Sequence, residues 1–433
     1  MRDLIRQKII DSFSLPIPPF THRDIYLPVV KSKAIAVIGT RRTGKSTYLW
    51  QILSERLDHG YPRESLLFFS FEDERLAGMK ANDLQIIVEE YYLLYPQFRD
   101  KHKVVFFLDE IQNVAGWETF VRRLLETEKI EVFISGSSAR LLSREVATSM
   151  RGRAMEALIH PFSFREYLRH LDKEPNKELN RLTKAERSIL EKHLRDYLLC
   201  GGFPETVGLN ARDRFDLLRG YVDISLLRDV IERHKVSHPV ALRWMIRHLL
   251  TNAGGYFSVN KFYGDLKSQG IQVAKDTLHE YFNYLEDAFL IRTVSIASRS
   301  ERRRMVNPRK VYPIDSGLIK LYDPVGQTNL GHTLETCILL ELERRGAEIW
   351  YIRNSTGTEV DFLTRYPDDR RELIQVCTHL DTENVREREL RGLHDALSEN
   401  KNCTAHLIVL EPEIPQGLPN SIQVHRASEW LLS

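Results

Sequence analysis

The stretch KSKAIAVIGTRRTGKS, from Lys31 to Ser46, decides the fold of this chain. Its first half is a short apolar run that ends at a glycine, which is typical of a buried β-strand. A helix is expected to follow, from about Lys45 to Leu57. The loop between them fits the pattern G-x-x-x-x-G-K-[ST], with its fixed positions at Gly39, Gly44, Lys45 and Ser46. Strand, loop and helix in this order predict a phosphate-binding loop.

The residue types in this loop match the chemistry of a bound nucleotide. Glycines let backbone N–H groups curl around phosphates, Lys45 can reach the β and γ oxygens, and the Ser46 hydroxyl can ligate magnesium. We therefore expect ATP and Mg²⁺ as cofactors. The residues expected to contact the nucleotide are Gly39, Thr40, Arg41, Arg42, Thr43, Gly44, Lys45, Ser46 and Thr47.

A second stretch, VVFFLDEIQ from Val104 to Gln112, supplies two acids at the end of an apolar run. Asp109 would hold Mg²⁺ through its water shell, and Glu110 would orient or deprotonate the attacking water. The alternative is that the two acids only end a strand and cap a helix. An adjacent Asp–Glu pair favours hydrolysis over passive storage of the nucleotide.

Further elements alternate along the N-terminal part of the chain. Strands are expected at Ser65–Phe71 and Val132–Ser137, and helices near Asp83–Leu94 and Trp117–Thr127. Apolar strands that alternate with helices indicate an α/β fold with a parallel sheet covered on both faces. Beyond Pro161 the pattern becomes helical, as in a lid.

The length of 433 residues exceeds what one hydrophobic core usually organises. We expect an N-terminal leader and ATP-binding core (1–160), a helical lid (161–239), a winged-helix domain (240–322) and a C-terminal α/β domain (323–433). The formal net charge of +2 excludes a uniformly basic surface. No apolar run is long enough to span a membrane, so no membrane partner and a cytoplasmic location are expected. The four cysteines are expected to be reduced and buried.

At this point the sequence resembles the AAA+ and related P-loop ATPases. More narrowly, it resembles the prokaryotic ATPase family in which an AAA-type core is followed by a C-terminal domain known as DUF4143. The resemblance covers nearly the whole chain. It is carried by GTRRTGKST, FSFEDERL, FFLDEIQNVAGWE, ISGSSARLL, MRGRAMEALIHPFSFREYL, GGFPE, KVYPIDSGLI and GTEVDFL, in that order.

The resemblance implies further parts of the nucleotide site. Ser137 would be the polar sensor after the fourth strand, with Ser135 and Ser138 as rivals. Arg153 or Arg151 would be the arginine finger offered to a neighbouring subunit, where a cation stabilises the transferring phosphoryl group. The alternative is that these arginines form surface ion pairs. A finger that acts on a neighbour implies a head-to-tail homo-oligomer, most simply a closed ring such as a hexamer.

The motif GGFP resembles the glycine–proline motif with which the lid touches the nucleotide, through Gly202 and Pro204. It lacks the arginine that many AAA+ proteins have there, which argues against sensing by charge. A tight turn without ligand contact is the alternative.

The segment after Val240 predicts a winged helix. Ser258 would cap a helix that ends near Ser268, Gly270 would make the turn, and a second helix would run from Val273 to Asp287, before a β-hairpin. The expected nucleic-acid contacts are Lys275 on the second helix, whose outward residues would include Asp276, Thr277 and His279, and the hairpin-tip residues Arg299, Arg302, Arg303 and Arg304. Arginines on such a tip suit phosphate contacts without sequence readout. The alternative is subunit packing, since Glu280, Glu286 and Asp287 make the second helix acidic.

The C-terminal segment resembles the PD-(D/E)xK nuclease fold, in which acids and a lysine hold metal and activate water. Glu335 and Asp361 match the first two acids. Gln375 and Cys377 stand where the third acid and the lysine should be, and Glu359 or Glu372 could replace the acid only in part. We expect an inactive module that serves binding or assembly.

Three functions follow from these patterns. The first is an AAA+ ATPase that hydrolyses ATP with Mg²⁺ as a ring oligomer and binds or remodels DNA. The second is an ATP-controlled signalling or oligomerisation switch that binds a protein partner. The third is an ATP-regulated DNA nuclease.

Overall fold

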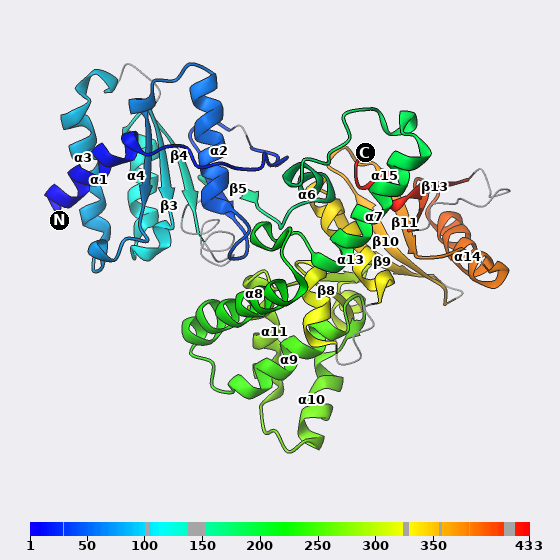
Figure 1. Ribbon diagram of the computed structural model, residues 1–433. Coiled ribbons are helices and arrows are strands. Elements are labelled where there is room, and N and C mark those ends of the chain that lie inside the picture. Colours follow the sequence, from blue (N-terminus) through cyan, green and yellow to red (C-terminus); the bar gives the residue numbers. More distant parts are fainter. Residues whose placement is uncertain are drawn as a thin grey trace. The chain divides into compact units, whose positions relative to one another are not determined.

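The computed structural model contains two compact units, Met1–Ile159 and His160–Ser433 (Figure 1). The structure describes residues 1–28, 30–99, 104–136, 150, 152–323, 329–354, 357–380, 382–410 and 421–433. No helix in these ranges is both long enough and apolar enough to cross a membrane.

The first unit is built on a five-stranded parallel sheet with the order β2-β3-β4-β1-β5. The order of the strands brings the carboxyl ends of β1, β3 and β4 together, and this is where ligands bind in open parallel sheets. The expected α/β fold is confirmed. The strands are β1 (Ala34–Ile38), β2 (Leu66–Ser70), β3 (Val104–Asp109), β4 (Ile130–Ser135) and β5 (Ala154–Leu158).

Helices cover both faces of this sheet. Helix α2 lies on one face, and the other described helices lie on the opposite face (Figure 1). Strands β1 and β3 are buried along their whole length, as their apolar sequences predict. The helices are α1 (Arg2–Ser14), α2 (Lys45–Asp58), α3 (Gln85–Leu94) and α4 (Trp117–Thr127).

The second unit contains one eight-stranded sheet with the order β13-β12-β11-β10-β9-β7-β8-β6. Strand β7 of the predicted hairpin pairs in parallel with β9 of the C-terminal region, so one sheet spans both segments. Its strands are β6 (Tyr256–Phe257), β7 (Ile291–Ile296), β8 (Arg309–Pro313), β9 (Glu348–Arg353), β10 (Glu359–Arg365), β11 (Arg371–Cys377), β12 (Thr404–Val409) and β13 (Ile422–Arg426).

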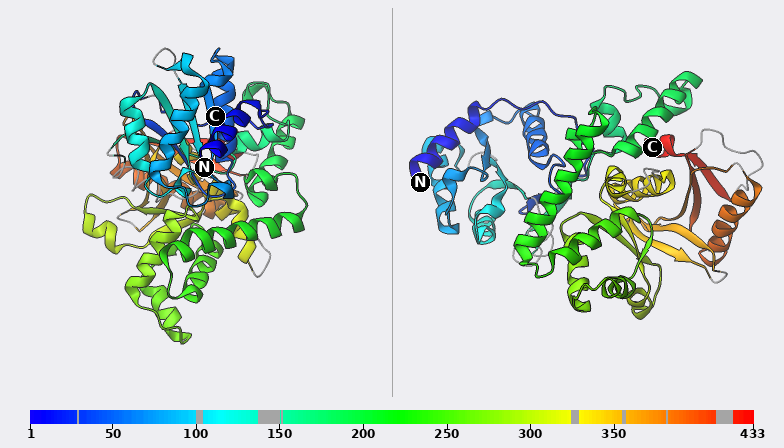
Figure 2. Two further views of the ribbon diagram at one scale, coloured as in Figure 1. Left: turned by 90° about the vertical axis from the view of Figure 1, so that its left-hand side faces the viewer. Right: turned by 60° about the horizontal axis from the view of Figure 1, so that its bottom comes forward.

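Helices α13 and α14 of the second unit pack on opposite faces of the C-terminal part of this sheet (Figure 2). Helix α8 continues into π-helical turns, η9, at Ser225–Glu232. The helices are α6 (Phe164–His170), α7 (Lys184–Cys200), α8 (Ala211–Ile224), α9 (Pro239–Thr251), α10 (Val259–Ser268), α11 (Lys275–Asp287), α12 (Glu301–Val306), α13 (Leu330–Arg344), α14 (Glu383–Glu399) and α15 (Ala427–Trp430).

Three local expectations are confirmed only in part. The side chain of Ser258 stands at the N-cap of α10 but makes no capping hydrogen bond. The tip between β7 and β8 contains the short helix α12, because Ser300 caps it by accepting from the Arg303 N–H. Of the four cysteines, all of which are free thiols, Cys337 is buried and the others are half-buried.

Candidate functional site: the nucleotide loop and the acids of strand β3

The phosphate loop joins β1 to α2 and needs glycine at two positions. Gly39 has a φ of 150°, and a Cβ there would lie 2.3 Å from the carbonyl oxygen of Ile159. Gly44 has a φ of 90° and is the N-cap of α2 without a side-chain capping bond. Side chains rarely adopt these conformations, so the loop geometry itself explains both glycines.

Lys45 lies at the start of α2 and is buried inside its own loop. Its Nζ donates to the carbonyl oxygen of Thr40 at 2.9 Å, and the hydroxyl of Thr43 donates to the same oxygen at 2.9 Å. A buried ammonium that donates to a backbone carbonyl has a neutral acceptor, which a phosphate oxygen can replace with a stronger bond. The loop therefore has the features of an anion-binding site.

Asp109 ends β3 and joins the loop to β4. Its Oδ1 accepts from the Ser46 hydroxyl at 2.8 Å and from the Ser135 hydroxyl at 2.5 Å. Burial raises the pKa of the Asp109 carboxyl, and the hydrogen bonds from Ser135 and Ser46 oppose that rise. The structure thus brings together the two residues that the sequence suggested for Mg²⁺.

Glu110 follows directly in a left-handed backbone conformation, with a φ of 54°. Its N–H donates to the Ser135 hydroxyl at 3.0 Å, and Gln112 donates from its side-chain amide to the Glu110 carboxylate. The Oε1 atom of Gln112 is buried and has no hydrogen-bond partner in the described structure. Strained non-glycine backbone concentrates at functional sites because surrounding contacts must maintain it.

The remaining predicted residues of this site lie in different places. Ser137, Ser138 and Arg151 are outside the described residues. Arg153 forms an ion pair with Glu126 on α4, beside a cavity of about 250 Å³ that Arg122 and Arg123 also line. Ser135 was a rival to Ser137 in the sequence, and Gln112 was not singled out at all.

The glycines of GGFP make close contacts within the second unit. A Cβ on Gly202 would lie 2.3 Å from the carbonyl oxygen of Phe162, and the Gly202 N–H donates to Asp315 Oδ2 at 2.6 Å. Asp315 is fully buried and also accepts from the Gly317 N–H at 2.9 Å. Burial raises the pKa of Asp315 to about 6. Pro204 begins a short 3-10 turn.

The predicted nucleic-acid contacts lie on α11 and around α12. Lys275 is exposed at the start of α11, and Arg299, Arg302 and Arg303 are exposed near the hairpin tip. Arg304 pairs with Glu301 one turn earlier. The same tip exposes two apolar side chains, Met305 at 78% and Val306 at 75%.

In the nuclease-like region, a lysine from the hairpin lies among the predicted acids. The Nζ of Lys310, on β8, lies 3.1 Å from Glu335, 2.7 Å from Glu359 and 3.0 Å from Asp361. Tyr312 donates to Glu335 at 2.7 Å. Sequence reasoning missed Lys310, because it precedes Glu335 and Asp361 by 25 and 51 residues and no spacing rule connects them.

The other residues of the nuclease pattern, as the structure describes them, make no hydrogen bond or ion pair with Lys310, and Gln375 belongs to a chain of hydrogen bonds that begins at Asp361. Asp361 donates from its N–H to Gln375 Oε1 at 3.2 Å, and Gln375 Nε2 donates to Glu389 at 2.8 Å. The Cys377 thiol donates to the carbonyl oxygen of His379. Glu372 accepts from Tyr366 and Arg370 instead of facing Lys310.

Burial, together with the negative charge of Asp361, raises the pKa of Glu335 to about 7. In the described part of the chain, no group of three or more His, Cys, Asp or Glu side chains is arranged to hold a metal ion.

Comparison with known proteins agrees with this geometry. Residues 31–168 match the family described as "AAA domain", and residues 191–327 match "Domain of unknown function (DUF8612)". The sequence had led us to expect DUF4143 after the core. The loop, the acids of β3 and the strand order are therefore those of a P-loop domain of the AAA type.

Full-length relatives place the chain more narrowly. It is 31% identical over 395 residues to "Uncharacterized protein MJ1544" of Methanocaldococcus jannaschii. The matched region spans 90% of this chain and 84% of that protein. The chain belongs to the family of this protein. An "Uncharacterized protein" of Haemophilus influenzae is 28% identical over 397 residues, 92% of this chain and 93% of that one. Among solved structures, the Walker-type ATPase Paby2304 of Pyrococcus abyssi has a TM-score of 0.43 and 14% identity, covering 74% of this chain and 95% of that one.

Proposed function

We propose that the protein hydrolyses ATP with Mg²⁺ at the junction of the phosphate loop and β3. The observation that carries the proposal is the 2.8 Å hydrogen bond between Ser46 and Asp109 next to Lys45. Ser46, the nucleotide phosphates and waters held by Asp109 would complete the shell of Mg²⁺, an ion that keeps several waters. Mg²⁺ would neutralise charge on the β- and γ-phosphates.

In this proposal Glu110 accepts a proton from the attacking water. Ser135 fixes the backbone of Glu110, and Gln112 holds its carboxylate, so both are positioning residues. Lys45 leaves the Thr40 carbonyl and donates to the phosphates. Ser137 as sensor, and Gly202 and Pro204 as lid contacts, remain parts of the proposal.

We further propose a ring-like homo-oligomer, a hexamer, in which Arg153 or Arg151 reaches the nucleotide of the neighbouring subunit. Support comes from the cavity that Arg153 shares with Arg122 and Arg123, since three guanidinium groups favour an anion. In the single chain, Glu126 neutralises Arg153. Formation of the ring would require this ion pair to open.

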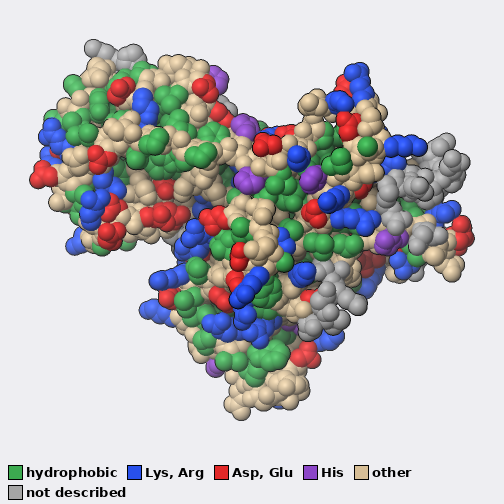
Figure 3. All heavy atoms as spheres, viewed as in Figure 1, with side chains coloured by type: hydrophobic (Ala, Val, Ile, Leu, Met, Phe, Trp, Pro, Cys, Tyr) green, Lys and Arg blue, Asp and Glu red, His purple; other side chains and the backbone are tan. Residues whose placement is uncertain are grey.

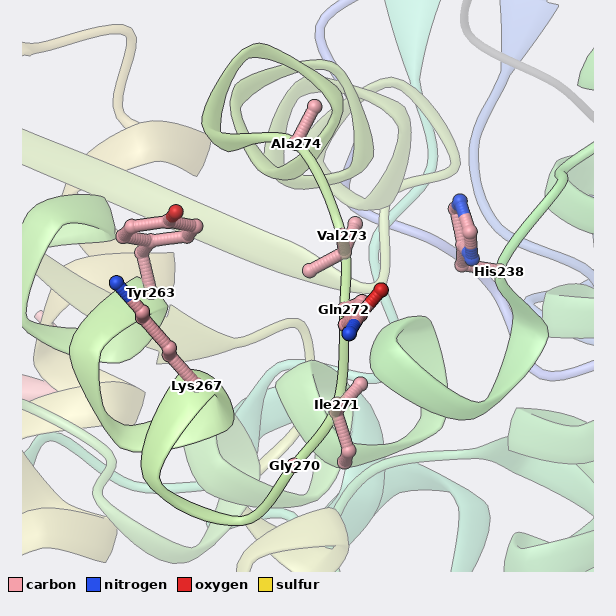
Figure 4. Close-up of a pocket in the computed structure, with 8 residues that line it drawn as sticks. All are labelled: His238, Tyr263, Lys267, Gly270, Ile271, Gln272, Val273 and Ala274. Atoms are coloured by element: carbon pink, nitrogen blue, oxygen red, sulfur yellow. The ribbon is translucent and has the colours of Figure 1, made fainter.

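DNA is the proposed substrate of the second unit. Arg299, Arg302 and Arg303 at the hairpin tip suit phosphate contacts. A cavity of about 620 Å³ lies at the turn before α11. Figure 4 shows the segment from Gly270 to Ala274 running between Lys267 on one side and His238 on the other, so that polar groups flank the turn.

The test is the ATPase rate with and without single-stranded, duplex and branched DNA at low salt, where phosphate contacts are strongest. Stimulation of turnover together with binding supports a DNA-remodelling ATPase. ATP turnover without any binding of DNA at low salt would remove DNA from the proposal and leave the ATPase.

A second candidate, the ATP-controlled switch that binds a protein partner, is favoured by exposed apolar residues on α8, η9 and α9. Val240 and Trp244 on α9 are 59% and 51% exposed, and Ile224 and Leu227 are 47% and 42% exposed. Figure 3 shows Lys and Arg side chains beside hydrophobic ones over this region. Exposed tryptophan beside arginine is typical of protein interfaces.

Turnover and size separate the two candidates. A switch turns ATP over very slowly and changes its oligomeric size when ATP binds, whereas a motor cycles repeatedly. Gel filtration with ATP and with ADP, alongside steady-state turnover, measures both properties.

For the nuclease-like region we propose binding or assembly without cleavage. Each of the three N–H donors of an ammonium group can serve one acceptor, and Lys310 has three carboxylates around it. Such a lysine has no donor left for a scissile phosphate. The check is incubation with supercoiled and branched DNA plus Mg²⁺ or Mn²⁺, where cleavage that is lost in Asp361→Asn would support the third candidate, an ATP-regulated nuclease.

A further inference from the structure

The segment before β1 is fastened to the nucleotide loop through Arg23. This arginine is only 6% exposed, and its Nη1 donates to the carbonyl oxygen of Thr43 at 2.8 Å. A buried guanidinium is costly unless its donors find acceptors. The acceptor here belongs to the phosphate loop, twenty residues farther along the chain.

The backbone of Arg23 is held as well. Its N–H donates to Gln51 Oε1 at 2.7 Å, and Gln51 Nε2 donates back to the Arg23 carbonyl oxygen at 3.1 Å. Gln51 is 3% exposed and lies on α2, the helix that starts at the loop. Gln51 also donates to Glu55 on the same helix at 2.9 Å. The Gln51 amide is therefore held both by α2 and by the segment before β1.

The bond to Thr43 has a consequence for the next residue. The Thr43–Gly44 peptide is trans, and in a planar trans peptide the C=O and the following N–H point in opposite directions. A guanidinium that holds the Thr43 carbonyl on its own side therefore turns the Gly44 N–H to the other side. The same Nη1 lies 3.6 Å from where a Cβ of Gly44 would be, so the guanidinium lies directly against this peptide.

We infer that Arg23 is a positioning residue of the nucleotide site, which fixes the Thr43–Gly44 peptide so that the Gly44 N–H is directed to the phosphates of a bound nucleotide. Gln51 anchors Arg23 for this task. The segment before β1 that contains Arg23 thereby becomes part of the ATP site, although no sequence motif marks this segment. The inference rests on nucleotide binding at the phosphate loop, as proposed above.

The role makes a specific kinetic prediction. A backbone N–H that binds phosphate contacts it in the ground state and in the transition state alike, and loss of such uniform binding raises KM and leaves kcat unchanged. In Arg23→Ala we expect affinity for ATP and ADP to fall by about tenfold, the effect of one hydrogen bond to a charged group. Arg23→Lys, which keeps a donor, should recover part of this loss.

The experiment compares full-length wild type, Arg23→Ala, Arg23→Lys and Gln51→Leu in nucleotide titration and in steady-state ATPase assays. Guanidinium chloride, far below concentrations that unfold the protein, should restore nucleotide affinity in Arg23→Ala by occupying the vacated space. Arg63→Ala is the matched control, because Arg63 also donates to two backbone carbonyls in this unit, those of Leu66 and Ser12, but does not touch the loop.

Each outcome decides the inference. Weaker nucleotide binding in Arg23→Ala, with unchanged kcat and rescue by guanidinium, supports it. A lower melting temperature with unchanged KM, or the same loss in Arg63→Ala, would overturn it and leave Arg23 a structural residue. If Arg23→Ala does not fold, the KM of Gln51→Leu and of Arg23→Lys decides in the same way. Wild-type protein that binds no nucleotide would instead refute the proposed ATPase.

Discussion

Two lysines, one in each unit, show how environment decides what a lysine can do. Lys45 and Lys310 are both buried, at 6% and 4% exposure. Lys45 meets a backbone carbonyl of its own loop, whereas Lys310 meets three carboxylates within 3.1 Å. A neutral acceptor can be exchanged for phosphate at little cost. A lysine surrounded by buried carboxylates cannot move away without leaving their negative charges unpaired. We therefore expect Lys45 to bind a ligand and Lys310 to stabilise the sheet of the second unit.

The largest effect is expected from Lys310→Met. Without the ammonium, buried carboxylates lose their partner, and breaking a buried pair in this way costs about 3–5 kcal/mol. Denaturant unfolding at pH 8 measures the loss, while nucleotide affinity should stay at the wild-type value. Adding Glu335→Gln to Lys310→Met should recover part of the stability. Unchanged stability in Lys310→Met would mean that the cluster does not hold the sheet together.

Lys45→Ala should have the opposite profile. Removing a charged donor to phosphate should weaken ATP binding by about 10- to 150-fold. The melting temperature without nucleotide should change less than in Lys310→Met, since the Thr40 carbonyl that Lys45 holds is neutral. Calorimetric titration with ATP and Mg²⁺, next to thermal unfolding, checks both expectations. A collapse of stability with intact affinity would reverse the comparison.

A third, smaller effect on stability concerns Asp315, a buried acid that accepts hydrogen bonds from the backbone N–H groups of Gly202 and Gly317. Its pKa is raised to about 6, so the folded chain binds this proton more tightly than the unfolded chain. Its contribution to the free energy of unfolding is therefore full below pH 4 and is lost as the pH rises through 6. Asp315→Asn should remove a slope of at most about 1.4 kcal/mol per pH unit between pH 4 and 6. Unfolding midpoints across this range test it, and an unchanged slope would contradict the assignment.

The smallest effect tests the exposed cations at the hairpin tip, in contrast to both buried lysines. Arg302→Gln with Arg303→Gln should reduce the salt slope of DNA binding by about two, one for each phosphate contact. Binding titrations over a range of salt concentrations measure this slope. Arg304→Gln is the matched control, because Glu301 already neutralises that side chain. Equal slopes in the double variant and in wild type would remove α12 from the DNA interface.

Local patterns predicted much of the first unit. Strand β3 and helix α4 have the predicted bounds. Strand β3 is a continuous apolar run that ends at an acid, and α4 has apolar residues at helical spacing. Strand β5 was missed since Ala154–Leu158 is a short edge strand with only one buried residue. No helix was predicted at the start of the chain, although Ile5 and Ile9 give α1 one buried face.

Contacts between segments that are far apart in the chain could not be predicted from the sequence. The residues of the phosphate loop follow a fixed spacing from Gly39 to Ser46, so the motif alone predicted them. Lys310 reaches its acids, and Arg23 its carbonyl, only because sheet order and chain path bring them together. The GGFP motif suggested contacts of Gly202 and Pro204 with the nucleotide. It could not reveal the close contact of Gly202 with Asp315, because Asp315 lies 113 residues farther along the chain.

The account depends on Mg²⁺-bound ATP lying on the phosphate loop with its terminal phosphate facing Asp109 and Glu110. Single-turnover hydrolysis of γ-labelled ATP by wild type and Glu110→Gln tests this most directly. We predict equal ATP affinity and a rate about 10²- to 10⁴-fold lower in Glu110→Gln, because general-base catalysis contributes that much. Equal rates in the two proteins, or no binding of ATP by either, would contradict it.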